Sequence, residues 1–290
     1  LHYGQAIFEG MKAYKDDHDD VWLFRPDQNI KRLNKSAERL AIPQFPEDLF
    51  LEGLHKLIDL DRNWVQSGAG NSLYIRPFMF ASEACVQASP AKEYRIMIIC
   101  APVSSYYNSG EVRVKIADHF SRAPQGGTGY AKAAGNYAGQ FYPTQLAIDE
   151  GYQQIIWTDA ATHQYIEEAG TMNLFFYIGD KLITAPTSDS ILDGVTRKSV
   201  IELAKDLGIE VETRQLSVSE LIESAKNNSL KEIFGSGTAV VVLPIHGFGY
   251  KEEDFQLPKS EDSIALKLKS KLISIQYNKT DDPFGWRVKV

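Results

Sequence analysis

Hydrophobic residues recur at helical spacing in several parts of the chain. In the stretch NIKRLNKSAERLAI, Ile30, Leu33 and Ala37 fall on one face of a helix. Asn29 opens this stretch and is predicted to cap the helix at its N-terminus. The same spacing predicts further helices over residues 46–60, from about residue 136, and over residues 195–208, 219–227 and 263–277.

Other segments form short apolar or alternating runs bounded by turn residues, which is typical of strands. The clearest is NLFFYIGDKLITA, which predicts a hairpin that turns at Gly179 and Asp180. FGSGTA, residues 234–239, predicts a glycine turn between two more strands. We expect further strands over residues 72–80, 94–103, 112–118, 153–159 and 209–217.

The polar, turn-prone stretch SSYYNSGEV, residues 104–112, separates two halves of the chain. A chain of 290 residues fits roughly two domains of about 150 residues each. We therefore expect a small N-terminal domain over residues 1–108 and a larger one over residues 109–290. Strands and helices mix within both halves, which favours two α+β domains over one doubly wound sheet.

Composition and charge narrow the function classes. A hydrophobic content of 43% and a charged content of 24% are typical of globular proteins. The net charge of -7 argues against a nucleic-acid binder, and no apolar stretch is long enough to span a bilayer. Cys85 and Cys100 lack CxxC spacing, which argues against a disulfide framework or a cysteine zinc site and fits a reducing cytoplasm. The chain opens at LHYGQAIFEG without an initiator methionine, so we expect further residues upstream.

The stretch GGTGYAKAAGNYAGQ, residues 126–140, places one lysine among five glycines. A flexible linker would lack aromatic residues, whereas Tyr130 and Tyr137 flank Lys132. The phosphate-loop pattern GxxxxGK[ST] is absent. A plain structural turn stays one interpretation, and the other is a lysine that forms Schiff bases with carbonyl compounds.

Two adjacent acids precede a strand in YIEEAGTMNLFF. Neighbours in an extended segment face opposite ways, so one of Glu167 and Glu168 can point inward while the other is solvated. A solvated pair is the simpler interpretation. A buried carboxylate would instead suit the protonated ring nitrogen of pyridoxal phosphate.

Two glycine-containing turns have the composition of anion sites. In LDGVTRKSV, Gly194 leads into a helix whose first amide groups would be free to bind a phosphate. FGSGTA adds the hydroxyls of Ser236 and Thr238. Each is compatible with an ordinary helix start or hairpin turn. Together with Lys132 and an acid, the set suits pyridoxal phosphate.

Six motifs, in order along the whole chain, carry a family resemblance: LHYGQAIFEGMKAY, YIRP, GNYAGQ, EEAGTMN, LDGVTR and FGSGTA. They resemble the branched-chain amino acid aminotransferases, class IV pyridoxal-phosphate enzymes of fold type IV (D-amino-acid aminotransferase-like). The resemblance implies two α+β domains with the cofactor at their interface. The CxxC of mammalian members is replaced by VVVL at residues 240–243, which indicates a bacterial-type member without that thiol regulation. The family's segment before LHY is missing here.

The resemblance implies a role for each cofactor contact. Lys132 would be the Schiff-base lysine and would carry a proton between Cα and C4′. Tyr137 would hydrogen-bond the ring hydroxyl, and Glu168 would keep the pyridine nitrogen protonated. The phosphate would be bound by Arg32, Val195, Thr196 and Thr238.

The resemblance also implies a substrate pocket. Arg76 would help it accept the side-chain carboxylate of glutamate, and the amides of Thr238 and Ala239 would hold the substrate carboxylate. Part of the wall would come from a partner subunit, so we expect at least a homodimer. The implied substrate residues are Tyr3, Phe8, Tyr74, Arg76, Thr171, Thr238 and Ala239, with Tyr3, Val86 and Ala88 contributed across the subunit boundary.

The expected activity is reversible ping-pong amino transfer between L-leucine, L-isoleucine or L-valine and 2-oxoglutarate. Other fold type IV enzymes, a D-amino-acid aminotransferase or an aminodeoxychorismate lyase, are the first alternative. FEGMKAY and YIRP favour the branched-chain interpretation over them. An inactive paralogue that binds a phosphorylated ligand is the second, against which the presence of both Lys132 and Glu168 argues.

Overall fold

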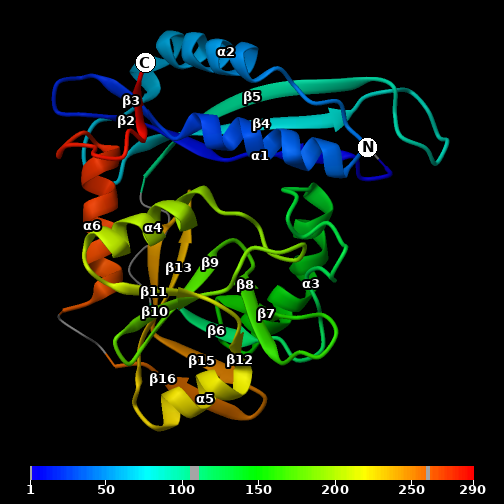
Figure 1. Ribbon diagram of the computed structural model, residues 1–290. Helices are drawn as coiled ribbons and strands as arrows, with labels where there is room; N and C mark the ends of the chain where they lie inside the picture. The colour runs from blue at the N-terminus through cyan, green and yellow to red at the C-terminus, as the bar shows by residue number, and fades with distance from the viewer. Residues whose placement is uncertain (1, 105–110, 259–261) are drawn as a thin grey trace. The chain divides into compact units, whose positions relative to one another are not determined.

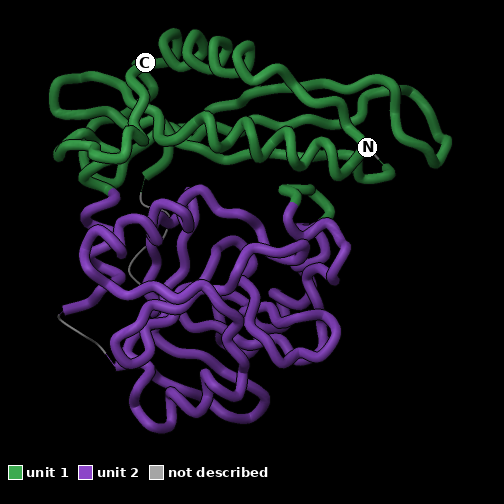
Figure 2. The backbone as a smooth tube through the Cα atoms, in the orientation of Figure 1, with its two compact units in different colours: residues 1–106, 131–135, 273–290 green, residues 107–130, 136–272 purple. Residues whose placement is uncertain are grey.

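The computed structural model describes residues 2–104, 111–258 and 262–290, and the chain divides into two compact units (Figure 2). Unit 1 contains residues 1–106, 131–135 and 273–290, and unit 2 contains residues 107–130 and 136–272. The predicted division into residues 1–108 and 109–290 differs from this one, because the chain returns to unit 1 twice. The stretch 105–110, which holds most of the predicted boundary, lies outside the described residues.

Unit 1 is built on one antiparallel sheet (Figure 1). β4 pairs with β2 near its start, with β1 near its end and with β5 along its whole length. β3 pairs with β2 and with β17, which brings the C-terminal segment back into unit 1. The predicted strands over residues 72–80 and 94–103 are confirmed as β4 and β5. The sheet strands are β1 (Ala6–Phe8), β2 (Met11–Lys15), β3 (Val21–Phe24), β4 (Ser72–Ala81), β5 (Tyr94–Val103) and β17 (Arg287–Lys289).

Two helices lie wholly within the described part of unit 1, α1 (Pro26–Arg39) and α2 (Glu47–Leu60), and the short 3-10 turn η1 (Arg62–Trp64) follows them. The predicted apolar face of α1 is confirmed, because Ile30, Leu33 and Ala37 are buried in the core with residues of α2 and the sheet. The predicted start of this helix was wrong. Pro26 occupies its first turn, where a missing amide hydrogen costs nothing, so Asn29 lies inside the helix rather than at its cap.

Unit 2 contains two sheets. The first has the order β11-β10-β9-β13-β14, and the second has the order β12-β8-β7-β6-β15-β16. The first consists of β9 (Asn173–Ile178), β10 (Lys181–Thr184), β11 (Glu210–Thr213), β13 (Leu230–Gly237) and β14 (Val241–Ile245). The second consists of β6 (Arg113–Ile116), β7 (Gln154–Thr158), β8 (Tyr165–Ala169), β12 (Leu216–Ser217), β15 (Gly247–Tyr250) and β16 (Glu253–Gln256).

Local signals located several elements of unit 2 well. The predicted hairpin is the β9–β10 pair, and Gly179 at its turn has φ of 61°, a left-handed value that glycine adopts without strain. The segment 209–217, predicted as one strand, is instead two short strands in different sheets, β11 and β12. The helices are α3 (Ala134–Asp149), α4 (Val195–Asp206), α5 (Val218–Lys226) and α6 (Ile264–Gln276), and the α+β class is confirmed.

Candidate functional site

Lys132 belongs to unit 1, whereas the sequence analysis placed it in the larger C-terminal domain. Ala133, beside it, forms a β-bridge with Ile7 of β1, which draws this segment into unit 1. The Phe8 amide donates a hydrogen bond to the Lys132 carbonyl at 3.1 Å. The Lys132 amide donates to Ser36 Oγ at 2.9 Å. The main chain of the lysine is therefore held on both sides.

The ring of Phe8 lies close to two cationic side chains. Lys132 Nζ lies 5.0 Å from the ring centroid, and the Arg76 guanidinium lies 4.6 Å from it. Arg76 Nη2 also donates to the Tyr74 hydroxyl at 2.8 Å. Arg76 Nε is buried and makes no hydrogen bond to the described residues, which leaves a donor suited to an anionic group. Four predicted site residues thus lie together: Phe8, Tyr74, Arg76 and Lys132.

Arg32 on α1 is buried and faces a carboxylate that the sequence analysis did not single out. Its Nε and Nη2 donate to the two oxygens of Glu9 at 2.7 Å and 2.9 Å. Asn29 Nδ2 and the Gly10 amide donate to the same carboxylate at 2.7 Å and 3.2 Å. Burial alone would raise the pKa of Glu9, but the charge and hydrogen bonds of Arg32, the charge of Lys132 and the Asn29 bond together lower it. Glu9 is therefore a buried anion at neutral pH.

Glu168 lies at the end of β8 in unit 2, and its side chain is 6% exposed. Arg122 Nη2 lies 2.5 Å from its Oε1. Asn173 Nδ2 and the Leu192 amide donate to its Oε2 at 3.0 Å and 3.3 Å. A carboxylate with these partners is oriented by groups from three segments, so its position is fixed before any ligand arrives.

Glu168 is buried and Glu167 is half-buried, so neither acid is fully solvated, although one of the two was expected to be. Glu167 Oε1 accepts a hydrogen bond from Ser190 Oγ, and its Oε2 is buried without a hydrogen bond to the described residues. Burial raises the pKa of this carboxyl against the opposing effects of Ser190 and Arg122. The loop at residues 188–192, which no sequence pattern predicts, donates hydrogen bonds to both acids, from Ser190 to Glu167 and from Leu192 to Glu168.

Tyr137 is half-buried in the first turns of α3. The start of this helix is anchored to the glycine-rich loop by Asn136. Thr128 Oγ1 donates to Asn136 Oδ1 at 2.7 Å, and Asn136 Nδ2 donates to the Thr128 carbonyl at 2.8 Å. The loop is thus tied to the helix that carries Tyr137, which is inconsistent with a flexible linker.

The first residues of α4, Val195 and Thr196, are buried, and Gly194 is the N-cap in an extended conformation. Among the described residues, no side chain caps this helix start. A Cβ on Gly194 would lie 2.0 Å from Asn173 Oδ1, so the close approach requires glycine here. The amide groups at this end are available donors for an anion.

The turn between β13 and β14 holds Thr238 and Ala239, both half-buried. Ser236, at the end of β13, is buried, and its Oγ makes no hydrogen bond to the described residues. Thr171 lies exposed just before β9. An unsatisfied buried hydroxyl next to a glycine turn is a second polar feature of unit 2 that a ligand would satisfy.

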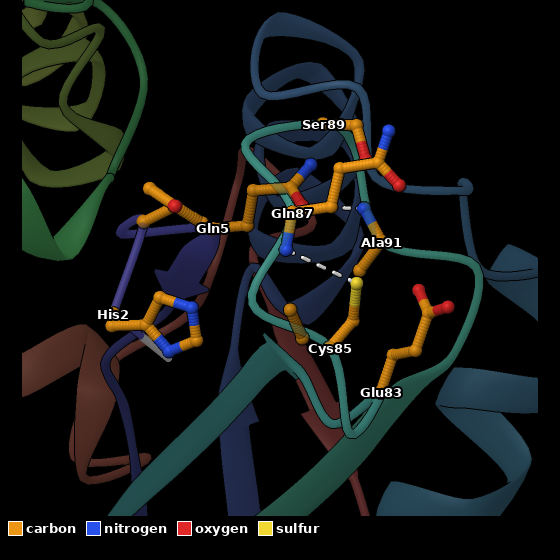
Figure 3. Close-up of a pocket in the computed structure, with 9 residues that line it drawn as sticks. His2, Gln5, Glu83, Cys85, Gln87, Ser89 and Ala91 are labelled. Carbon is orange, nitrogen blue, oxygen red and sulfur yellow. Dashed lines mark hydrogen bonds between the residues drawn. The ribbon is translucent and has the colours of Figure 1, made fainter.

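The remaining predicted residues form a separate group on unit 1. Tyr3, Val86 and Ala88 are exposed, and the Tyr3 hydroxyl donates to the Val86 carbonyl at 2.9 Å. A small polar pocket opens beside them, in which Gln87 and Ala91 make the hydrogen bonds drawn in Figure 3. The pocket is lined by His2, Tyr3, Gln5, Ala81, Glu83, Cys85, Gln87, Ser89 and Ala91.

Two other features are absent from the described residues. Within residues 2–104, 111–258 and 262–290, no helix is both long and apolar enough to cross a membrane. Over the same ranges, no three histidine, cysteine or acidic side chains are grouped as a metal site requires.

Comparison with known proteins finds aminotransferases by sequence and by structure. The model of the family described as "Amino-transferase class IV" matches residues 6–248. A probable branched-chain-amino-acid aminotransferase of Staphylococcus epidermidis is 45% identical over 100% of this chain and 82% of its own length. The crystal structure of the Escherichia coli branched-chain amino acid aminotransferase has a TM-score of 0.80 at 28% identity, over 99% of this chain and 90% of that one.

A second solved structure carries a ligand. It is a T.th. branched-chain amino acid aminotransferase complexed with N-(5'-phosphopyridoxyl)-L-glutamate. Its TM-score is 0.80 at 25% identity, over 99% of this chain and 90% of that one.

Proposed function

Because this chain belongs to the class IV aminotransferases, and within them to the branched-chain-amino-acid aminotransferases, we propose that it transfers amino groups reversibly between L-leucine, L-isoleucine or L-valine and 2-oxoglutarate. The observation that carries the proposal is Lys132. Its amine lies beside the Phe8 ring, and its main chain is held from both sides. A lysine held in this way is suited to covalent chemistry with a carbonyl group.

The groups present fit pyridoxal 5'-phosphate, the proposed cofactor. Its aldehyde requires an amine to bond with, and its pyridine nitrogen requires a carboxylate partner. Its phosphate requires several hydrogen-bond donors. Lys132 offers the amine, and Glu168 offers a buried carboxylate fixed by Arg122. The uncapped start of α4, the Thr238 hydroxyl and Arg32 offer donors to a phosphate. The phosphopyridoxyl complex of the T.th. relative supports this choice.

When bound, the cofactor supplies an aldehyde that accepts the amino group and a ring that withdraws electrons from the substrate. Lys132 Nζ would take the proton from the substrate Cα and deliver it to C4′, acting as base and then as acid. Glu168 would hold a proton on the ring nitrogen, because a negatively charged carboxylate beside that nitrogen favours its protonated form. Tyr137 would donate to the ring hydroxyl and fix the tilt of the ring.

The substrate would be bound by groups of both polarities. The Thr238 and Ala239 amides are proposed to hold the α-carboxylate. The Arg76 guanidinium, with its unsatisfied Nε, is proposed to bind the second carboxylate of glutamate. Phe8 and Tyr74 would contact the aliphatic side chain of leucine, and Thr171 would complete the pocket. The same residues would thus accept a charged and an apolar side chain in turn.

We also propose that the working unit is a homodimer in the cytoplasm. Tyr3, Val86 and Ala88 are exposed, although the family resemblance assigns them to a substrate pocket. Their exposure is explained if these side chains complete the substrate pocket of a partner subunit. Sedimentation of the purified protein, with and without leucine, tests the subunit number directly.

The decisive experiment is an absorption spectrum of the purified protein before and after L-leucine is added. We expect a visible absorption band that disappears when leucine is added and returns when 2-oxoglutarate is added. The Lys132→Ala protein should show neither change. The matched control is Lys56→Ala, which alters an exposed lysine on α2. A band that D-alanine but not L-leucine removes would assign the protein to the D-amino-acid aminotransferases. No band with added pyridoxal phosphate would overturn the proposal.

A further inference from the structure

One face of α1 presents three polar side chains that are buried: Asn29, Arg32 and Ser36. Their spacing places them on the same side of the helix, because residues three and four apart lie one above the other. Asn29 and Arg32 bind Glu9, as described above. Ser36, one turn further, is fully buried and contacts the main chain of Lys132.

The Ser36 hydroxyl makes two hydrogen bonds with a fixed direction. The Lys132 amide can only donate, so Ser36 Oγ accepts from it at 2.9 Å. The hydroxyl hydrogen then donates to the Arg32 carbonyl, also at 2.9 Å. This serine therefore joins the Arg32 turn of α1 to the Lys132 amide.

The other side of Lys132 is held by β1. The Phe8 amide donates to the Lys132 carbonyl, and Ala133 is bridged to Ile7. Ala131 and Ala133, the neighbours of the lysine in the chain, are both buried, whereas Lys132 itself is partly exposed. The direction in which the lysine side chain leaves the main chain is thus set by Phe8 on one side and Ser36 on the other.

We propose that Ser36 is a positioning residue, which holds the Lys132 main chain so that the amine is directed at the cofactor aldehyde. The inference rests on the proposed function. In the step concerned, the neutral amine condenses with the aldehyde, one carbon–nitrogen double bond forms, and the carbonyl oxygen leaves with two amine hydrogens as water. A fixed amine has a high effective concentration toward the aldehyde, and a mobile one has less.

The test compares two ligands on the full-length apoprotein. Pyridoxal phosphate can bond to Lys132, whereas pyridoxamine phosphate has no aldehyde and cannot. For Ser36→Ala we expect the dissociation constant of pyridoxal phosphate to rise about tenfold or more, since a misdirected amine loses part of its proximity advantage. The dissociation constant of pyridoxamine phosphate should stay within about twofold, since phosphate and ring contacts are unchanged. Absorbance titration measures the first constant, and displacement of pyridoxal phosphate measures the second.

Two further variants keep the test decisive if Ser36→Ala folds poorly. Ser36→Thr retains the hydroxyl, so the ratio of the two constants should return toward the native value even if the added methyl lowers stability. Ser224→Ala removes another buried helical serine, on α5, and should leave the ratio unchanged.

Equal weakening of both ligands by Ser36→Ala, or no weakening of either, would overturn the positioning role. A native apoprotein that binds neither ligand would instead refute the proposed function, so the two failures are distinguishable. A supporting measurement is a fall in kcat for leucine with an unchanged KM, which indicates an effect on the reacting groups rather than on substrate binding.

Discussion

Each unit contains a buried glutamate paired with an arginine, but the two pairs are built differently. In unit 1, Arg32 uses two nitrogens to bind both oxygens of Glu9. In unit 2, Arg122 approaches a single oxygen of Glu168 through Nη2, and its Nε is buried without a hydrogen bond to the described residues. The first pair has the forked geometry that arginine forms with carboxylates, and the second does not.

The rest of the Arg122 contacts explain the difference. Its Nη2 also donates to the carbonyls of Gly129 and Ser190 at 2.8 Å and 2.6 Å. Arg122 therefore connects Glu168 to two loops, whereas the side-chain bonds of Arg32 described above join it to Glu9. The same two residue types form a forked pair within unit 1 in one case, and in the other they hold the carboxylate that we propose for the cofactor's ring nitrogen.

The largest expected effect that sharpens this comparison is on stability. Glu9→Gln leaves the Arg32 charge buried without its partner, so the free energy of unfolding should fall by about 3–5 kcal/mol. Urea denaturation followed by circular dichroism measures it. Glu52→Gln, which breaks an exposed helical pair with Lys56, is the control and should change stability by about 0.5 kcal/mol or less. An unchanged urea midpoint for Glu9→Gln would show that the Arg32–Glu9 pair does not stabilise the fold.

The next effect is on activity. Glu168→Gln retains the shape of the side chain but removes the charge proposed to hold a proton on the ring nitrogen. We expect kcat/KM for leucine to fall by about 10²–10³-fold, the range found when one preorganised electrostatic contact is lost. Stability should fall less than in Glu9→Gln, because Arg122 keeps the carbonyls of Gly129 and Ser190 as acceptors. If the two variants lost stability equally and activity survived, the contrast between the pairs would be wrong.

A smaller effect concerns the loops that Arg122 connects. Arg122→Lys retains the charge, but the lysine nitrogen lies one bond nearer the main chain than Arg122 Nη2, the atom that contacts Glu168, Gly129 and Ser190. Buried acceptors left without a donor should lower the free energy of unfolding by about 1–3 kcal/mol, with a partial loss of activity. Arg214→Lys, which alters a half-exposed arginine of unit 2, is the matched control. Equal behaviour of the two variants would contradict the connecting role.

The smallest effect is on pH dependence, and the two acids Glu9 and Glu167 should differ in sign. The folded pKa of Glu9 lies below its ordinary value of 4.5, so its contribution to stability is present above that pH and is lost as the pH falls through the folded value. The folded pKa of Glu167 is raised, so its contribution is present below pH 4.5 and is lost as the pH rises through the folded value. Urea midpoints between about pH 3 and 7, on both sides of the ordinary glutamate pKa, should show a flatter acid limb for Glu9→Gln. For Glu167→Gln we expect the loss of stability above pH 4.5 to be reduced. Curves parallel to the native one would count against both assignments.

Elements with strong local signals were predictable from the sequence. The β9–β10 hairpin has its glycine at the turn, and α4 has Gly194 before it and Gly208, with φ of 74°, after it. Lys132 and Glu168 were predicted as site residues because each stands in a short motif of unusual composition. What sequence reasoning missed depends on distant pairing: β17 joins β3 across most of the chain, and Lys132 joins β1.

Supporting residues of the candidate site were missed for the same reason. Glu9 stands inside a motif that was recognised, and a carboxylate between apolar Phe8 and Gly10 was a weak signal of burial. Arg122 stands in the polar stretch HFSRAP, where nothing distinguishes it from a solvated arginine. Its role becomes visible only when the loops at Gly129 and Ser190 are placed in space.

The return of β17 to the sheet of unit 1 has a consequence for protein synthesis. A ribosome makes the N-terminal strands first, at about 5–20 residues per second. The edge of β3 that pairs with Arg287–Lys289 stays open until those residues emerge, after all of unit 2 has been translated. Unit 2 therefore has the opportunity to fold while the chain is still growing, whereas the sheet beside the Lys132 segment can be completed only after unit 2 has been translated.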